Sequence, residues 1–97
     1  MKTIYKITYA NNKIYVGKDL VYSINYFGSA DKNLIAEDFT WEEQQSFTIV
    51  REILWYSETA TNSEVNKKEV EFIMALNSND PSIGYNQWPK RKKAIAA

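Results

Sequence analysis

Residues 3–9 (Thr-Ile-Tyr-Lys-Ile-Thr-Tyr) are rich in β-branched and aromatic residues, and their side chains alternate between two faces. One face carries Thr3, Tyr5, Ile7 and Tyr9, and the other carries Ile4, Lys6 and Thr8. This period of two is typical of a β-strand. Asn11-Asn12 follows, a pair that tolerates the backbone of a tight turn, and residues 13–17 read as a second strand. The sequence therefore predicts an N-terminal β-hairpin.

A third strand is predicted over residues 46–57, which read Ser-Phe-Thr-Ile-Val-Arg-Glu-Ile-Leu-Trp-Tyr-Ser. Apolar residues are dense in this segment and do not alternate cleanly with polar ones. Such a pattern is typical of a strand that is buried on much of both faces. We therefore expect this strand to occupy a central position in the sheet.

Two helices have recognisable start signals. Thr40 and Glu43 have the spacing of a capping box, which predicts a short helix over 41–45. A longer helix is expected over 64–77, capped by Ser63 or Asn62. Its apolar residues recur near helical spacing; they are Val65, Phe72, Ile73 and Leu76.

The remaining segments are less regular. Asp19 is placed to cap a short helix over 20–26, although a loop fits the same residues, and a second short helix is expected over 29–37. Asp80-Pro81-Ser82 ends the long helix, and residues 84–89 (Gly-Tyr-Asn-Gln-Trp-Pro) form an aromatic loop.

These elements together predict an α+β fold. Its core is a small, mostly antiparallel three-stranded sheet, made of the N-terminal hairpin and a central strand and flanked by helices. Residues 1–89 are expected to form a single domain, and residues 90–97 a basic C-terminal tail.

Composition excludes several kinds of chemistry. The chain of 97 residues has no cysteine, which excludes disulfides and thiolate metal sites, and no histidine, which excludes zinc sites and nucleophile systems that need an imidazole. Lys plus Arg equals Asp plus Glu, at 12 each, so the whole surface is not the basic coat of many nucleic-acid-binding proteins. A local basic patch remains compatible with this balance.

The sequence gives no sign of a membrane segment or a signal peptide. Its longest apolar runs are only a few residues, and the start, Met1-Lys2-Thr3-Ile4, leads directly into the first strand. We therefore expect a cytoplasmic protein without a membrane partner.

Three motifs occur in a particular order along the chain. Ile4-Tyr5 lies on the first strand, Tyr15-Val16-Gly17 lies on the second, and Glu69 lies on the long helix ahead of a Gly84-Tyr85-Asn86 loop. In this order and at these separations the chain resembles the GIY-YIG nuclease superfamily, over roughly residues 2–88. Thr3 stands where the family name has glycine.

The resemblance implies hydrolysis of DNA phosphodiester bonds with one Mg²⁺ or Mn²⁺ ion. By matching motif, Tyr5 and Tyr15 would orient or activate the attacking water, Glu69 would bind the metal, and Asn86 would organise the pocket. These residue types suit the chemistry, because a carboxylate-held divalent ion can stabilise a leaving oxygen and a tyrosine can position water.

The family arginine has no counterpart, since Asn25 stands at its position. A cation is still needed for the charge that develops on the phosphoryl oxygens. We rank Lys18 first because it directly follows Gly17, Arg51 on the third strand second, and Lys32 third. Lysine is not equivalent to the planar, bidentate guanidinium.

Other interpretations of these residues stay open. Strand tyrosines often only pack, a helical glutamate is often solvated, and Trp41, Trp55 and Trp88 are expected in the core rather than as base-stacking platforms. The run Lys90-Arg91-Lys92-Lys93 is either a solvated tail or a contact to the DNA backbone. A nuclease with no further DNA-reading domain would take its specificity from a homodimer or a partner, if it has any. The alternative function is a catalytically weakened module that binds nucleic acid or a protein.

Overall fold

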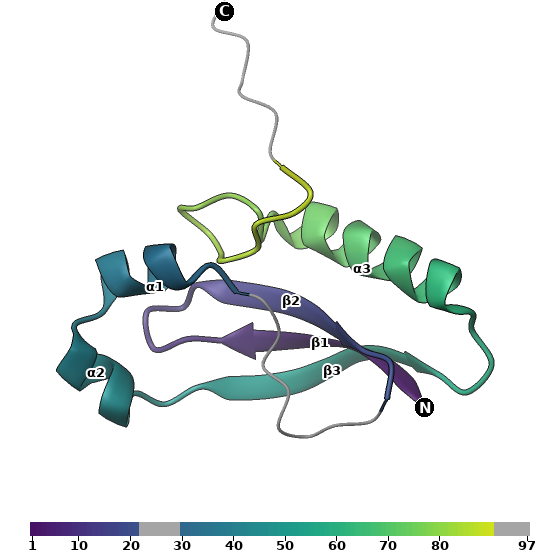
Figure 1. Ribbon diagram of the computed structural model, residues 1–97, viewed down its shortest axis with the longest axis horizontal. Coiled ribbons are helices and arrows are strands. Elements are labelled where there is room, and N and C mark those ends of the chain that lie inside the picture. Colours follow the sequence, from purple (N-terminus) through teal and green to yellow (C-terminus); the bar gives the residue numbers. More distant parts are fainter. Residues whose placement is uncertain (22–29, 91–97) are drawn as a thin grey trace, which may run out of the picture.

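The computed structural model describes residues 1–21 and 30–90 (Figure 1). Its elements, in chain order, are β1 (Lys2–Thr8), β2 (Ile14–Asp19), α1 (Lys32–Asp38), α2 (Trp41–Ser46), β3 (Val50–Ser57) and α3 (Asn62–Leu76). The three strands form one antiparallel sheet, and the helices lie around it. The predicted α+β class is therefore confirmed.

The hairpin of β1 and β2 has its turn at the predicted asparagines. Asn12 has a φ of 68°, in the left-handed region that asparagine tolerates better than most residues. The Tyr9 amide donates to the Lys13 carbonyl at 2.9 Å, and the Lys13 amide donates to Asn11 Oδ1 at 3.1 Å. Local turn chemistry thus fixes the register that pairs Tyr5 with Gly17.

The predicted central position of the third strand is wrong. The strand order is β2-β1-β3, so β1 is the central strand and β3 lies at one edge of the sheet. The apolar density that suggested burial belongs partly to exposed side chains, since Val50, Ile53 and Tyr56 are each more than half exposed. The strand also begins at Val50 and not at residue 46, because Ser46 ends α2.

A β-bulge interrupts the pairing of β1 with β3. Ile4 pairs with Trp55 and Tyr5 pairs with Ile53, so Leu54 is the extra residue. The bulge brings Leu54 and Trp55 together against the same apolar cluster.

Two apolar clusters stabilise the sheet. The first is an aromatic cluster made by Tyr5, Ile7, Tyr9, Tyr15, Phe39 and Tyr85, against which Leu34 and Ile35 of α1 pack. The second joins Ile4 and Val16 to Val65 and Ile73 of α3, together with Ala60. Because neighbouring residues of a strand point to opposite faces, β1 contributes to both clusters.

Each helix begins at a side-chain cap. The predicted capping box at the start of α2 is confirmed, with Thr40 and Glu43 bonding to each other's backbone amides. In α3 the cap is Thr61, paired with Glu64, and not Ser63 or Asn62 as predicted. Asp31 caps α1 by accepting from the amides of Asn33 and Leu34, so that helix begins later than residue 29.

The segment after α3 returns to the outer edge of β2. The Ile14 amide donates to the Ile83 carbonyl, and the Tyr85 amide donates to the Ile14 carbonyl at 2.8 Å. Gly84 lies so close to β2 that an added Cβ would be 2.5 Å from the Ile14 carbonyl oxygen. This contact carries residues 84–89 to the place where β2 faces α3.

Within residues 1–21 and 30–90, no helix combines the length and apolar character needed to cross a membrane. The helix or loop expected over 20–26 falls mostly outside these residues, as does Asn25.

Candidate functional site

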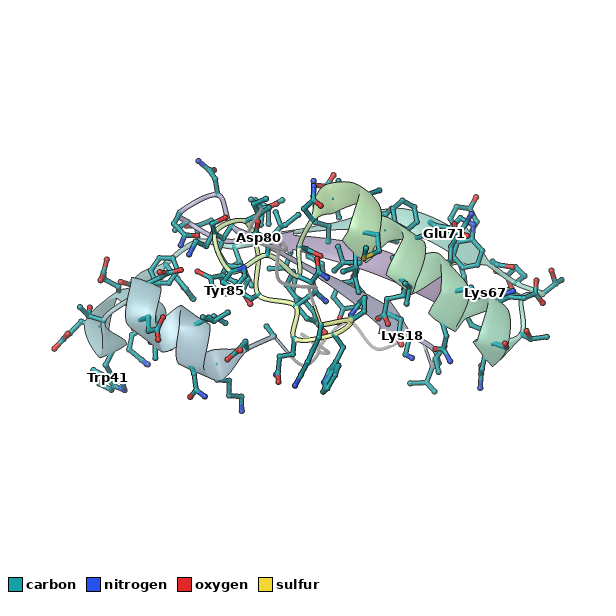
Figure 2. The ribbon with its side chains drawn as sticks, turned by 90° about the horizontal axis from the view of Figure 1, so that it is seen from above. Lys18, Trp41, Lys67, Glu71, Asp80 and Tyr85 are labelled. Carbon is teal, nitrogen blue, oxygen red and sulfur yellow. The ribbon has the colours of Figure 1, made fainter. Side chains whose placement is uncertain are left out.

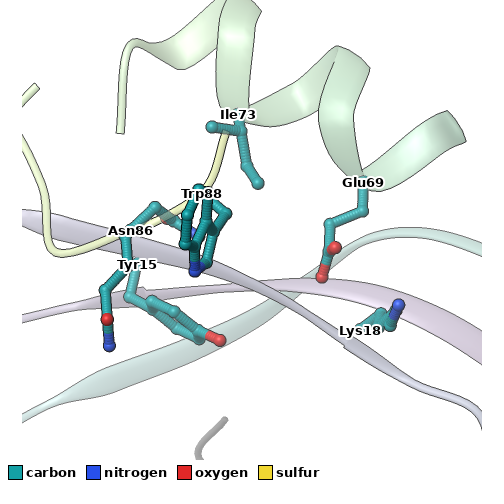
Figure 3. Close-up of a pocket in the computed structure, with 7 residues that line it drawn as sticks. Tyr15, Lys18, Glu69, Ile73, Asn86 and Trp88 are labelled. Carbon is teal, nitrogen blue, oxygen red and sulfur yellow. The ribbon is translucent and has the colours of Figure 1, made fainter. Parts of the chain in front are cut away.

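A pocket of about 360 Å³ opens between β2, α3 and residues 84–89, which form the C-terminal loop. Its lining residues are Tyr15, Lys18, Glu69, Ile73, Asn86, Gln87 and Trp88 (Figure 3). Four of the five residues that the sequence predicted as catalytic are among them: Tyr15, Lys18, Glu69 and Asn86. The fold thus brings together side chains from three segments that lie far apart in the sequence.

Glu69 reaches from α3 towards the strands, and Lys18 approaches it from β2 (Figure 3). Burial raises the pKa of the Glu69 carboxyl above its ordinary value, and the positive charge of Lys18 opposes this rise. The Lys18 ammonium also donates a hydrogen bond to Asn66 Oδ1, one turn before Glu69 on the same helix. A cation and a half-buried carboxylate therefore share one wall of the pocket.

Tyr15 borders both the aromatic cluster and the pocket. Its ring centroid lies 6.4 Å from that of Tyr5, with an angle of 52° between the planes. Gly17 makes this arrangement possible, because an added Cβ would lie 2.5 Å from the Tyr5 hydroxyl oxygen and 2.9 Å from a Tyr15 ring carbon. The glycine of the second motif thus gives the two tyrosine rings the space they occupy.

Asn86 fixes the C-terminal loop to β2. Its Oδ1 accepts from the Val16 amide and its Nδ2 donates to the Val16 carbonyl, both at 2.8 Å. The side chain thereby imitates one rung of a β-ladder, and it is 9% exposed. Both polar atoms of the amide are used in this contact, which makes Asn86 a positioning residue.

Tyr5 does not line the pocket. It is fully buried in β1, and the Arg51 guanidinium lies 4.3 Å from its ring centroid. Arg51 is therefore engaged in a cation–π contact within the sheet. Lys32, the third cation considered, is an exposed residue at the start of α1 and is also absent from the pocket lining.

The basic tail is described only at its first residue. Lys90 Nζ lies 5.1 Å from the centroid of the Trp88 ring, at the rim of the pocket. Arg91, Lys92 and Lys93 fall outside the described residues.

Three pocket residues were not predicted as site residues: Ile73, which was expected only as an apolar residue of the long helix, Gln87 and Trp88. Gln87 and Trp88 follow Asn86 directly, and their adjacency to a predicted site residue was the only available signal. Trp88 was expected in the core, but it is 65% exposed. Trp41 was expected there too and is 71% exposed, whereas Trp55 packs against the second apolar cluster.

The donor set of the pocket is compatible with a weakly held Mg²⁺ or Mn²⁺ ion. In the described part of the chain, Glu69 is the one carboxylate that lines the pocket, and no group of three or more Asp, Glu, His or Cys residues is placed to hold a metal. Mg²⁺ commonly binds through one or two carboxylates while keeping several waters and contacting a substrate phosphate. A volume of about 360 Å³ leaves room for a hydrated ion beside Glu69.

Comparison of the chain with protein-family models, with curated proteins and with solved structures gives no match.

Proposed function

We propose that the protein is a metal-dependent endonuclease that hydrolyses DNA phosphodiester bonds in the pocket between β2, α3 and the C-terminal loop. The observation that carries this proposal is the convergence of Tyr15, Lys18, Glu69 and Asn86 on one pocket. Motif resemblance singled out three of these residues, and sequence position next to Gly17 singled out Lys18.

Glu69 is the residue that would hold Mg²⁺ or Mn²⁺. The bound ion would supply positive charge to the phosphodiester as negative charge develops on it. A carboxylate must be ionised to bind a metal, and the pKa of Glu69 is raised by burial. Lys18 helps to keep Glu69 ionised, since its charge lowers the same pKa.

Lys18 also supplies the cation that the missing arginine would have given. Its ammonium lies on the pocket wall, whereas Arg51 is held against Tyr5 and Lys32 lies on another helix. In this role Lys18 would contact the phosphoryl oxygens. Such a donor is worth about 10²- to 10³-fold in rate, by analogy with oxyanion donors.

Tyr15 would position the attacking water, because its hydroxyl points towards the side of the pocket on which Glu69 and Lys18 lie (Figure 3). Tyr5 lies behind it and contacts its ring, so Tyr5 would position Tyr15 rather than touch the substrate.

A plasmid-nicking assay with Mg²⁺ and with Mn²⁺ tests the proposal. The parent protein should cleave, and Glu69→Gln should lose detectable cleavage because a neutral amide is a poor ligand for these ions. Glu71→Gln is the matched control: this neighbour on α3 is exposed, pairs with Lys68, and lies on the other side of the helix from Lys18 (Figure 2). Cleavage by Glu69→Gln equal to that of Glu71→Gln would contradict the proposal.

A second candidate is a module that binds DNA without cleaving it. One observation favours it: no arginine lines the pocket among the described residues, and Arg51 is committed to Tyr5. In that case the parent protein would bind DNA in a mobility-shift assay but would not nick the plasmid with either metal.

A further inference from the structure

Trp88 is an exposed aromatic ring at the mouth of a polar pocket. It is 65% exposed, yet it lines the same pocket as Lys18 and Glu69 (Figure 3). A large exposed apolar ring in a concave site with polar groups is a candidate surface for binding a ligand.

The loop on both sides of Trp88 is fixed to the fold. On the N-terminal side, Asn86 holds Val16 through two hydrogen bonds of 2.8 Å, and the Asn86 amide donates to the Ser78 carbonyl at 3.0 Å. On the C-terminal side, Asn79 Nδ2 donates to the Pro89 carbonyl at 2.8 Å. Trp88 is thus presented by an ordered loop, which lowers the entropic cost of binding a ligand on its ring.

One cation lies at this ring and another lines the same pocket. Lys90 Nζ lies over the ring, 5.1 Å from its centroid, and Lys18 lies across the pocket, next to Glu69 (Figure 3). Proteins that bind single-stranded nucleic acid combine these same parts: an aromatic face on which a base stacks and positive charges that contact the backbone phosphates.

A base inside a duplex cannot use such a platform, since its neighbours in the stack cover both of its faces. A base in a single strand, a flap or a frayed end has a free face. The geometry points to Trp88 as a stacking site for an unpaired DNA base whose neighbouring phosphate is contacted by Lys18. This inference rests on the proposed function for its choice of ligand, and it adds a preference for unpaired DNA.

Binding measured without metal separates this inference from cleavage. Fluorescence anisotropy would compare a labelled single-stranded 12-mer with a hairpin duplex of the same sequence, in EDTA. Trp88→Ala should weaken single-strand binding about 5- to 150-fold, which corresponds to the loss of one stacked base. Duplex binding should be unchanged, and Trp88→Phe should keep most of the single-strand affinity because it keeps an aromatic face.

Trp41→Ala is the matched control. Trp41 is 71% exposed on α2, at the end of the molecule that lies away from Lys18 (Figure 2), and its removal should leave both affinities unchanged. Unchanged single-strand binding in Trp88→Ala, or equal losses for single strand and duplex, would overturn the stacking site. If the parent nicks plasmid DNA but Trp88→Ala binds single strands normally, the proposed nuclease function stands and the stacking site is wrong. If the parent does not nick DNA but Trp88→Ala shows the predicted loss of binding, the stacking site stands and the nuclease function is wrong.

Discussion

At the scale of single residues, the charge state of Glu69 decides whether the pocket can hold a metal. Burial raises the pKa of its carboxyl and Lys18 opposes the rise. Metal binding should therefore weaken as the pH falls through this raised value, because a proton then competes with the ion. Lys18→Ala should move the pKa of Glu69 higher still, an effect that carbon-detected NMR titration of the carboxyl would measure. An unchanged titration midpoint in Lys18→Ala would show that the two groups do not interact.

The raised pKa of Glu69 also predicts how the stability of the protein depends on pH. A carboxyl with a raised pKa in the folded state contributes stability that is present below the unfolded pKa, about 4.3, and lost as the pH rises through the folded value. Glu69→Gln removes the ionised form, so at pH 7 it should be at least as stable as the parent. Urea unfolding at pH 7 checks this, and a clear loss of stability in Glu69→Gln would mean that the ionised carboxylate supports the fold.

Gly17 is predicted to be intolerant of even one methyl group. An added Cβ would lie 2.5 Å from both Cζ and the hydroxyl oxygen of Tyr5, which is fully buried and cannot move away easily. Gly17→Ala should therefore destabilise the protein by about 1–3 kcal/mol, the usual cost of overpacking. Urea unfolding monitored by far-UV circular dichroism measures the change, and an unchanged midpoint would contradict the close packing of Gly17 against Tyr5.

Asn86 should be equally sensitive to substitution, because its side chain makes buried hydrogen bonds. Its Nδ2 donates to the Val16 carbonyl inside a buried contact, and Asn86→Asp would place a carboxylate oxygen against that carbonyl. We expect a loss of about 1–3 kcal/mol in unfolding free energy. Asn79→Asp, at the Pro89 carbonyl of the same loop, is part-buried and should cost less. Equal costs would show that burial of the Val16 contact adds nothing.

Among the helices, the two capping boxes are expected to contribute differently to the global stability of the protein. Thr61 begins α3, which packs Val65 and Ile73 against the sheet, whereas Thr40 begins α2, which has no buried residue. Thr61→Ala should lower global stability by about 1 kcal/mol. Thr40→Ala should chiefly speed hydrogen exchange within α2 and leave the global midpoint almost unchanged. Equal effects of the two changes on the urea midpoint would contradict this difference between the helices.

The elements that the sequence predicted best are those fixed by neighbours in the chain. The hairpin turn at Asn11-Asn12 and the capping box of Thr40 with Glu43 need only local hydrogen bonds, and both occur as predicted. The third strand was placed wrongly because apolar character does not say which strand will pair with it. Ile53 and Tyr56 are exposed at the sheet edge, and only the tertiary pairing of β1 with both other strands shows why.

The candidate site was also predicted only in part from the sequence. The motifs led to Tyr15, Glu69 and Asn86, which do meet in the pocket, but they gave no sign that Tyr5 is covered by Arg51 or that Trp88 stands at the rim. Those facts depend on which face of a strand turns inward and on where a loop crosses β2. Neither follows from spacing along the chain.

At the scale of the whole molecule, one polar network joins α1, the hairpin turn and the C-terminal loop. The Asp38 carboxylate accepts from Lys13 Nζ at 2.6 Å and from the Tyr85 hydroxyl at 2.7 Å. The hydrogen bonds from Lys13 and Tyr85 lower the pKa of Asp38, while burial raises the pKa of Tyr85 to about 12. This network is partly exposed, so its effect is expected in pH dependence more than in total stability.

The two shifts have opposite consequences at the two ends of the pH range. The contribution of Asp38 is present above its unfolded pKa, about 3.9, and is lost as the pH falls through the lower folded value. The contribution of Tyr85 is present below about pH 10 and is lost as the pH rises towards 12. Asp38→Asn should reduce the loss of unfolding free energy at acid pH, and Tyr85→Phe should reduce the loss at alkaline pH. Unfolding midpoints measured across the pH range test both. A variant whose pH dependence equals that of the parent would show that the substituted group does not cause the loss.

The proposed nuclease function depends on Glu69 holding a metal in the pocket between β2, α3 and the C-terminal loop. The most direct measurement is a crystal structure of the protein soaked in Mn²⁺, with the ion located by its anomalous signal. We predict one Mn²⁺ about 2.1 Å from a Glu69 carboxylate oxygen, with waters completing an octahedral shell and with Tyr15 and Lys18 around it. A pocket without manganese, at a concentration that saturates other carboxylate sites in the crystal, would contradict the proposed metal-dependent function.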